Sequence, residues 1–527
     1  MRDAKRIIWA IVFLMSVLTV VNLPSHKVIA ANNGSITSAQ AYTLGTTKSG
    51  SITENGSEKQ YYKFTLQSSG SIHISGSAYV NWMDMFIYDA SANDVWNVRP
   101  SWNSTSEVIA INENVFLTSG TYYFCIQKGY GNGNFNFKID FITTSESFKE
   151  SQSENNNTLA TSSSIQLGNT MYTAQIAIND EKDFFKFVLQ QSGKISFKAT
   201  FYKMNWVEWK LYDENGVEIF NQRPSCNNTT ENIVVSEDVY LTSGSYYICM
   251  NYGYGYGKYT FSIPFISSNE TYAETNGGSN NTISTASTLT LGNNYNGQIA
   301  VNDDKDFYKF SLSAKAPLSL NVTGDIGYGY IKMYDSSGNE ISSKYFSKDN
   351  TTQKVSYSEV LSLEAGTYYI SISKGTEGDY TLNLSQLTQD NCPHDYESEW
   401  HSATYFEQGY RLYTCKWCGK TYQDEYSNKL ILSKPAISTS YSYGMKKKLK
   451  MQWSSVYDAT GYELSYATKK NFKNAKKINI KGKYKTTRTI KKLKKKKWYY
   501  VRVRAYVQSG GKKAYSPWSG KVKIRTR

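Results

Sequence analysis

Histidine, cysteine and proline are scarce in this chain of 527 residues, which has 4 His, 6 Cys and 8 Pro. Because His26 lies in a segment that we expect to be removed, catalytic constellations built on histidine are nearly excluded. No second long apolar run follows Val21, which argues against membrane-spanning helices in the rest of the chain. Tyr (45) and Gly (36) are abundant instead, so we expect a folded and mostly β protein.

The N-terminus has the pattern of an export signal. Arg2, Lys5 and Arg6 precede an apolar run from Ile7 to Val21, and Val28-Ile29-Ala30 offers a cleavage site before Ala31. A membrane anchor is the alternative, but the apolar run is shorter than the roughly 20 residues that a spanning helix needs. We therefore expect residues 1–30 to be a signal peptide. The mature protein would be secreted, extracellular or associated with the cell wall, and without a transmembrane segment.

Charge is segregated along the chain. Residues 429–527 hold 29 Lys/Arg and only two acidic residues, whereas residues 31–428 hold 26 basic and 41 acidic residues. The overall net charge of +15 therefore averages a strongly basic end and an acidic body. Any polyanionic partner belongs to the basic end.

Three internal repeats precede residue 390. The motifs Gln60-Tyr61-Tyr62-Lys63-Phe64, Asp183-Phe184-Phe185-Lys186-Phe187 and Asp306-Phe307-Tyr308-Lys309-Phe310 begin 123 residues apart. Apolar residues alternate with period two between turn residues, which is typical of a β-sandwich. We predict repeat 1 at 36–144, repeat 2 at 155–267 and repeat 3 at 279–387. The polar stretches at 145–157 and 267–281 read as solvated linkers.

The repeats resemble the bacterial pre-peptidase C-terminal domain, a jelly-roll-like sandwich similar to clostridial collagen-binding domains. Repeat 3 carries the resemblance best, through Asp306-Phe307-Tyr308-Lys309-Phe310, Tyr334-Asp335 and Gly366-Thr367-Tyr368-Tyr369. Repeats 1 and 2 depart from it by extra Trp residues and a shared Arg-Pro-Ser at 99–101 and 223–225. The resemblance implies a jelly-roll-like sandwich in each repeat.

Residues 430–527 resemble a fibronectin type III domain. Trp453, Gly461-Tyr462, Leu493 six residues before Tyr499, and Tyr515-Ser516-Pro517-Trp518-Ser519 carry this resemblance. It implies that the Tyr499 hydroxyl ties a loop to the sandwich. The family usually turns on Pro-Gly where this chain has Lys494 to Lys497.

Residues 388–428, here called the cassette, carry Cys392-Pro393-His394 and Cys415-Lys416-Trp417-Cys418-Gly419. Thiolates and imidazole in two clusters suit tetrahedral zinc, so we predict a structural zinc site at Cys392, His394, Cys415 and Cys418. The stretch resembles a zinc-ribbon-like cassette of Gram-positive surface proteins, although Tyr405 stands where relatives often have a further Cys. A disulfide such as Cys415 with Cys418 is the alternative in an exported protein.

Of the other thiols, Cys125 and Cys249 share a repeat position that alternation places on the outward face, and a bridge between Cys226 and Cys249 is weakly supported.

Acidic residues precede the aromatic strand in repeats 2 and 3. Asp180, Asp183, Asp303 and Asp306 are candidate calcium ligands, because calcium takes clustered carboxylate oxygens and the collagen-binding resemblance also implies calcium. Ordinary Asp/Asn turns are the alternative. Repeat 1 has Glu54, Asn55, Glu58 and Gln60 instead, which argues against a shared site.

Aromatic residues recur on the outward face of the repeats. Counting by twos from the Tyr-Asp strand ends places Trp82, Trp206 and Tyr328 outward, with Trp96 and Trp102 as a rim together with Tyr252, Tyr254 and Tyr256. Such rings stack on sugars or proline-rich chains, and simple cross-strand pairing is the alternative.

The C-terminal domain has two runs of lysines that suggest polyanion binding: Lys446, Lys447, Lys448, Lys494, Lys495, Lys496 and Lys497. No motif indicates sequence-specific nucleic-acid recognition.

No motif combines a nucleophile, a base and an oxyanion partner. The sequence thus predicts an all-β chain of tandem sandwiches: three jelly-roll-like repeats, the cassette and a fibronectin type III sandwich. We expect a non-enzymatic adhesion protein that binds extracellular polysaccharide or matrix protein through the repeats and an anionic cell-wall polymer through its basic end. A structural spacer, or an accessory relative of a secreted protease, is the alternative.

Overall fold

The computed structural model describes residues 33–54, 58–151, 155–226 and 231–527. The predicted signal peptide lies outside these residues. Strands make up 59% of the described residues and helix 2%, which confirms the all-β prediction. Among the described residues, no helix is long and apolar enough to span a membrane. Backbone contacts divide the chain into two compact units: residues up to 311 with 321–357 and 367–383, and residues 312–320 and 358–366 with 384–527.

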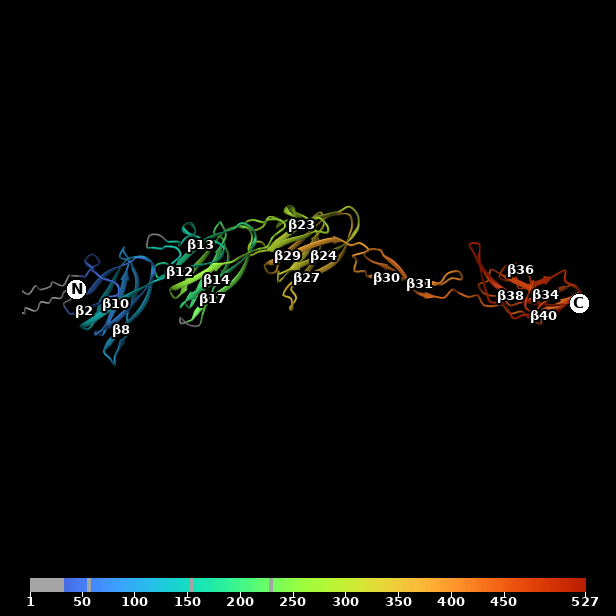
Figure 1. Ribbon diagram of the computed structural model, residues 1–527, viewed down its shortest axis with the longest axis horizontal. Helices are drawn as coiled ribbons and strands as arrows, with labels where there is room; N and C mark the ends of the chain where they lie inside the picture. The colour runs from blue at the N-terminus through green and yellow to red at the C-terminus, as the bar shows by residue number, and fades with distance from the viewer. Residues whose placement is uncertain (1–32, 55–57, 152–154, 227–230) are drawn as a thin grey trace, which may run out of the picture. The chain divides into compact units, whose positions relative to one another are not determined.

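Repeat 1 has two five-stranded sheets (Figure 1). The first has the order β1 (Gln40–Ala41), β3 (Lys59–Leu66), β9 (Gly120–Tyr130), β5 (Trp82–Tyr88), β6 (Asp94–Val98). The second has the order β2 (Thr47–Ile52), β10 (Gly133–Thr143), β4 (Gly70–Ala78), β8 (Val108–Leu117), β7 (Trp102–Asn103). Alternation along β3 turns Tyr62 and Phe64 into the core.

Repeat 2 has the same arrangement. Its first sheet has the order β11 (Ser163–Ser164), β13 (Lys182–Leu189), β18 (Gly244–Tyr254), β15 (Trp206–Tyr212), β16 (Glu218–Gln222). Its second has the order β12 (Gly168–Ile176), β19 (Gly257–Ile263), β14 (Gly193–Tyr202), β17 (Asn232–Leu241), with β20 (Phe265–Ser267) also on β14. The core contains stacked rings such as Phe197 and Trp209, whose centroids are 4.3 Å apart.

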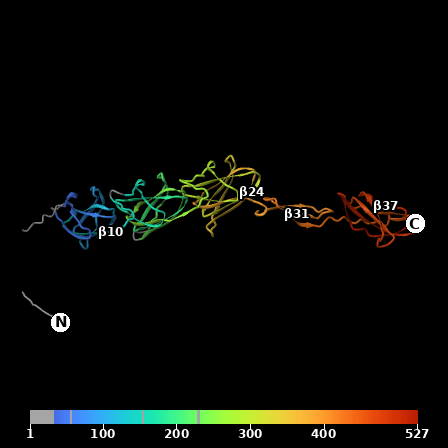
Figure 2. The same cartoon turned by 45° about the horizontal axis from the view of Figure 1, so that its top comes forward.

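The third pair of sheets, where Figure 2 labels β24 (Ala316–Gly324), repeats this order. One sheet has the order β21 (Ser287–Thr288), β23 (Lys305–Leu312), β28 (Gly366–Lys374), β25 (Tyr328–Tyr334), β26 (Glu340–Ser347). The other has the order β22 (Asn294–Ile299), β29 (Gly378–Gln386), β24 (Ala316–Gly324), β27 (Val355–Leu363). A short 3-10 turn with a capping box precedes each first sheet: η1 (Ile36–Ser38), η2 (Leu159–Thr161) and η3 (Ile283–Thr285).

The cassette is a three-stranded antiparallel sheet of β30 (Tyr396–His401), β31 (Gly409–Cys415) and β32 (Thr421–Ser427). The C-terminal domain packs two sheets around Trp453, Tyr462 and Val503. One sheet has the order β33 (Tyr443–Met445), β34 (Lys448–Gln452), β37 (Thr487–Ile490). The other has the order β36 (Lys476–Lys481), β35 (Gly461–Ala467), β38 (Trp498–Ser509), β39 (Lys512–Tyr515), with β40 (Val522–Arg525) also on β38. The Tyr499 hydroxyl accepts a hydrogen bond from the Lys494 N–H at 3.0 Å, as the resemblance implied.

Candidate metal centres and binding surfaces

Cluster A consists of Glu150, Asp180 and Asp183, each offering one carboxylate oxygen within 4.8 Å of the others. All three side chains are buried, and Tyr259 donates a hydrogen bond to Asp183 Oδ2. The other buried oxygens around the cluster have no hydrogen-bond donor among the described residues: Glu146 Oε1, Glu150 Oε2, Asn156 Oδ1, Asn157 Oδ1, both carboxylate oxygens of Asp180, and Asp183 Oδ1. Carboxylate and amide oxygens gathered without donors are the ligand set that calcium requires.

Cluster B reproduces this arrangement with Glu274, Asp303 and Asp306. Here Tyr380 donates to Asp306 Oδ2. The buried oxygens without a hydrogen-bond donor match those of cluster A one for one: Glu270 Oε1, Glu274 Oε2, Asn280 Oδ1, Asn281 Oδ1, both carboxylate oxygens of Asp303, and Asp306 Oδ1. The structure thus places each predicted Asp pair in a buried pocket of oxygens.

Burial and mutual repulsion make these groups hard to ionise without a cation. Burial, and then the nearby charges of Asp183 and Asp180, raise the pKa of Glu150 to about 12. Burial raises the pKa of Glu146 and of Glu270 to about 7, and burial raises the pKa of Glu274 to about 12. Because no cation of the protein pairs with these carboxylates among the described residues, a bound divalent ion would supply the missing charge.

The glutamates of both clusters come from segments that the sequence predicted to be solvated linkers. That prediction is wrong for Glu150, Asn156, Glu274 and Asn280, which are at most 5% exposed. The signal that sequence reasoning missed is a shared Glu-x-aromatic-x-Glu pattern at 146–150 and 270–274. Its central ring anchors the segment: Phe148 stacks on Tyr172 at 5.6 Å, and Tyr272 stacks on Tyr295 at 5.8 Å.

Repeat 1 has no equivalent cluster among its described residues. Gln60 takes the place of Asp183, and its amide donates to the Ser51 carbonyl at 2.8 Å. Asn55 lies outside the described residues.

The cassette brings its four predicted ligands together. One atom of each of Cys392, His394, Cys415 and Cys418 lies within 4.8 Å of the others. The Cys392 and Cys415 sulfurs are 3.7 Å apart, and Cys418 Sγ is 3.4 Å from His394 Nδ1. Zinc–sulfur bonds of about 2.3 Å in a tetrahedron put sulfurs about 3.7 Å apart, so the spacing fits the metal. No disulfide joins Cys415 to Cys418.

Thiolate formation is favoured at Cys415, whereas burial raises the pKa of Cys392. Burial opposes ionisation of Cys415, but hydrogen bonds from the Cys418 backbone N–H and the His394 ring lower its pKa to about 6. A thiolate is the form that binds zinc. The arrangement can therefore hold a structural metal ion.

The outward position of Cys125 and Cys249 is not a solvent-exposed one. Both thiols are buried, because neighbouring side chains on that face cover them, and burial raises the pKa of each to about 12. No disulfide joins Cys226 to Cys249.

The predicted aromatic face is only partly assembled. Trp82, Trp206 and Tyr328 are 38%, 38% and 42% exposed, as alternation predicted. Trp96, however, packs against the repeat 1 core, and Trp102 lies on β7 in the other sheet, so neither forms a rim around Trp82. Tyr254 is exposed beside Trp206, and Tyr252 stacks on Tyr256 at 4.5 Å.

Two predicted basic runs meet at one end of the C-terminal domain. Leu493 N–H donates to the Lys447 carbonyl at 3.0 Å, which joins the exposed runs Lys446–Lys448 and Lys494–Lys497. Arg525 Nε donates to the Lys496 carbonyl at 3.3 Å and adds its charge. Arg502 and Arg504 do not belong to this surface, because both stack on Trp518 and Arg504 pairs with Glu463 at 2.7 Å.

No protein-family model matches the chain, and no curated protein matches it. Among solved structures, the chain is similar to the pre-peptidase C-terminal domain of collagenase from Bacillus anthracis, at 18% identity over 19% of this chain and 94% of that one (TM-score 0.16). It is also similar to a two-domain fibronectin type III segment of chicken tenascin, at 15% identity over 42% of this chain and 99% of that one (TM-score 0.17). A third match, titled as a myokine structure, has 20% identity over 18% of this chain and 98% of that one (TM-score 0.15).

Proposed function

We propose that this protein is a non-enzymatic, secreted or cell-surface binding protein whose second and third repeats each hold calcium. The observation that carries this proposal is the matched pair of acid clusters, in which seven corresponding buried oxygens lack a donor. Extracellular modules bind calcium at about 10⁻⁴ to 10⁻³ M, the range of extracellular calcium. Calcium in such sites fixes the segments that carry Glu150 and Glu274.

In this proposal the repeats bind an extracellular carbohydrate or matrix polymer. Zinc holds the cassette, and the basic end of the C-terminal domain binds an anionic cell-wall polymer. The hydrogen bond between the Leu493 N–H and the Lys447 carbonyl brings the two runs of exposed lysines together. This supports binding of an anionic polymer, because a concentrated positive surface attracts polyanions over a Debye length.

Calorimetric titration of the mature protein with calcium tests the metal assignment. We expect two sites per chain, and one site in each of the variants Asp183→Asn and Asp306→Asn. Asp304→Asn is the matched control, because Asp304 is exposed and outside cluster B. The absence of any binding at calcium concentrations of about 5 mM would overturn the proposal.

A structural spacer is the second candidate, and the packing of Trp82 favours it. A Cβ on Gly129 would lie 2.1 Å from the Trp82 ring, and Arg99 Cζ is 4.3 Å from the ring centroid, so the ring is engaged in cross-strand packing. If Trp82→Ala with Trp206→Ala leaves glycan and matrix-protein binding unchanged, those rings serve the sandwich and not a ligand.

A further inference from the structure

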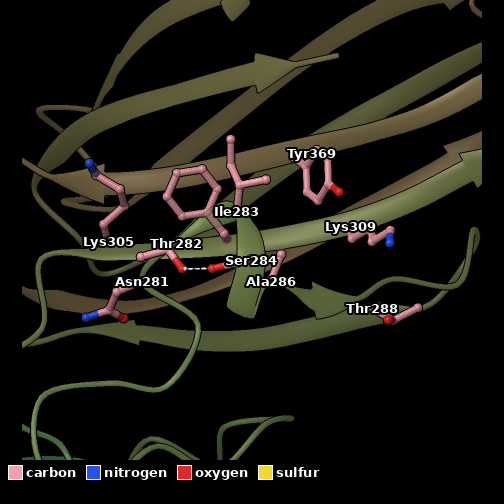
Figure 3. A pocket seen from close by; sticks show the side chains of 10 residues that line it. Asn281, Thr282, Ile283, Ser284, Ala286, Thr288, Lys305, Lys309 and Tyr369 are labelled. Carbon is pink, nitrogen blue, oxygen red and sulfur yellow. Dashed lines mark hydrogen bonds between the residues drawn. The ribbon is translucent and has the colours of Figure 1, made fainter. Parts of the chain in front are cut away.

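Repeat 3 carries an open cavity of about 760 Å³ on the outer side of its first sheet. Figure 3 shows Lys305 and Lys309 on opposite sides, with Ile283 of the η3 segment and Tyr369 between them. Phe307 also lines the cavity and is 6% exposed. The polar rim comes from Asn281, Ser284 and Thr288. We call this the groove of repeat 3.

The residues that build this groove recur in all three repeats. The first sheet of each repeat presents Lys, an aromatic residue and Lys at alternate positions, followed by a Tyr on the neighbouring strand. These sets are Lys59, Tyr61, Lys63 and Tyr123; Lys182, Phe184, Lys186 and Tyr247; and Lys305, Phe307, Lys309 and Tyr369. In each set the second lysine lies over the Tyr ring, at 5.9, 5.5 and 5.8 Å. A second aromatic contact also recurs, between Tyr61 and Tyr88, Phe184 and Tyr212, and Phe307 and Tyr334, at 5.7 to 5.8 Å.

The six lysines keep their charge available for a ligand. No ion pair of the described residues includes any of them. Lysines two strands away in the same sheets, on β15 and β25, behave differently: Lys210 pairs with Glu218 at 3.0 Å and Lys332 with Glu340 at 2.9 Å. The same sheet therefore holds neutralised lysines on one strand and unpaired lysines beside the groove.

A half-buried tyrosine ring, two ammonium groups and hydroxyl or amide groups suit an acidic sugar. The ring packs on the apolar face of a pyranose, ammonium groups bind its carboxylate, and the rim hydrogen-bonds to its hydroxyls. A peptide added as an extra strand fits less well, because the edge strand β21 has only two residues and offers few backbone groups. We propose that the groove of repeat 3, and the matching residue sets of repeats 1 and 2, bind acidic sugar units of an extracellular polysaccharide, which names the ligand class of the proposed function and rests on it.

Cluster B supports the groove of repeat 3. Phe307 N–H donates to the Asn280 carbonyl at 2.8 Å. Asn281 lines the groove, and its Oδ1 is one of the buried oxygens of cluster B without a hydrogen-bond donor. Calcium would fix this wall and neutralise carboxylates that repel an acidic ligand. The matching residue set of repeat 1 has no such cluster among the described residues, so we expect its affinity for the ligand to be independent of calcium.

The test uses the mature chain, hexameric oligogalacturonate as probe, and neutral maltohexaose and poly-glutamate as comparison ligands. Two variants change charge equally: one replaces Lys59, Lys63, Lys182, Lys186, Lys305 and Lys309 with Gln, and the other replaces Lys446, Lys447, Lys448, Lys494, Lys495 and Lys496 with Gln. In calcium and at about 0.15 M salt, we expect the first variant to lose about tenfold in oligogalacturonate affinity and the second to keep most of it.

A third variant, Tyr123→Ala with Tyr247→Ala and Tyr369→Ala, keeps all charges and is expected to weaken oligogalacturonate about as much as the first. The thermal transition of each variant checks that it is folded. Equal oligogalacturonate affinity of the wild type and the first variant would overturn the proposal. So would poly-glutamate that binds the wild type as tightly as oligogalacturonate does and loses the same affinity in the first variant. If calcium titrates normally but no oligogalacturonate binds, the groove proposal fails while the calcium proposal stands.

Discussion

Asp183 and Asp306 show what one carboxylate does inside a sandwich. Each is at most 1% exposed and has one oxygen held by a tyrosine hydroxyl and one without a donor. A buried charge without a partner costs stability, whereas a cation that binds only the folded state compensates this charge and stabilises the fold. These two residues are therefore the most sensitive reporters of metal binding.

We predict that Asp183→Asn stabilises the calcium-free protein at pH 7.5 and removes one of two calcium-induced increases in Tm. Removing one of several crowded carboxylates lowers the repulsion, and removing a ligand lowers calcium affinity. Saturating calcium at about 100 times Kd stabilises a site by about 2.7 kcal/mol, which sets the size of the lost increase. Calorimetric scans with calcium and with chelator measure it, and an unchanged increase in the variant would show that Asp183 is not a ligand.

The raised pKa values of Glu146 and Glu270, both about 7, predict a pH dependence. The unfolded-state pKa of Glu is near 4.3. Because the folded-state pKa is higher, the contribution of each group to the free energy of unfolding is fully present below pH 4.3 and is lost as the pH rises through about 7. Without calcium, the urea midpoint of repeats 2 and 3 should therefore fall between pH 5 and pH 8. With calcium, which competes with protons for the carboxylates, the fall should disappear. A calcium-free midpoint that rises over this range contradicts the assignment.

At the scale of the element, the cassette has three strands and a small apolar cluster of Leu387, Cys392 and Cys415. So little apolar burial does not hold a sheet of this size on its own, whereas a structural metal ion contributes folding free energy directly. We therefore expect the fold of the cassette to depend on a metal ion held by Cys392 and His394 before β30 and by Cys415 and Cys418 at the β31–β32 turn.

We expect Cys415→Ser to lower bound zinc from one ion per chain to none, and to unfold the cassette while the repeats keep their transition. Metal analysis with hydrogen exchange of residues 396–427 measures both. Cys226→Ser is the control, because Cys226 lies outside the cassette. An intact mass two hydrogens below the reduced value, without zinc, would favour the disulfide alternative.

At the scale of the whole molecule, charge separates an acidic body from a basic end. The acidic body includes carboxylates that we assign to calcium, whereas the basic end is an exposed surface without a dedicated acidic partner beyond Asp458 and Glu463. Binding by the two parts should differ in its response to salt. Long-range attraction is screened, and ring stacking is not.

For this reason we expect the variant with Lys494, Lys495, Lys496 and Lys497 changed to Gln to leave a heparin column at a lower salt concentration than the wild type. Binding of neutral salt-insensitive ligands should not change. Changing Lys210 and Lys332 to Gln is a control of the same sign, because both are already paired with glutamates. Equal elution of wild type and variant would show that this basic surface binds no polyanion.

The sequence by itself determined the all-β class and the alternation that turns Trp82 outward, and it predicted the three repeats and the four side chains that meet in the cassette. Each of these depends on residues within one strand or one short motif, where local periodicity and spacing decide the outcome. The Asp pairs of repeats 2 and 3 could be predicted as candidate calcium ligands for the same reason, because each pair lies within one short motif.

Only the tertiary structure decided what meets those residues. Glu150 and Glu274 fold back from segments that look like solvated linkers, and Cys125 is covered by side chains of neighbouring strands. Trp102 lies on the other sheet from Trp82. The groove of repeat 3 joins residues 281–288, β23 and β28. Such contacts depend on which distant segments pack together, and that choice is set by burial over the whole sandwich and not by any local pattern.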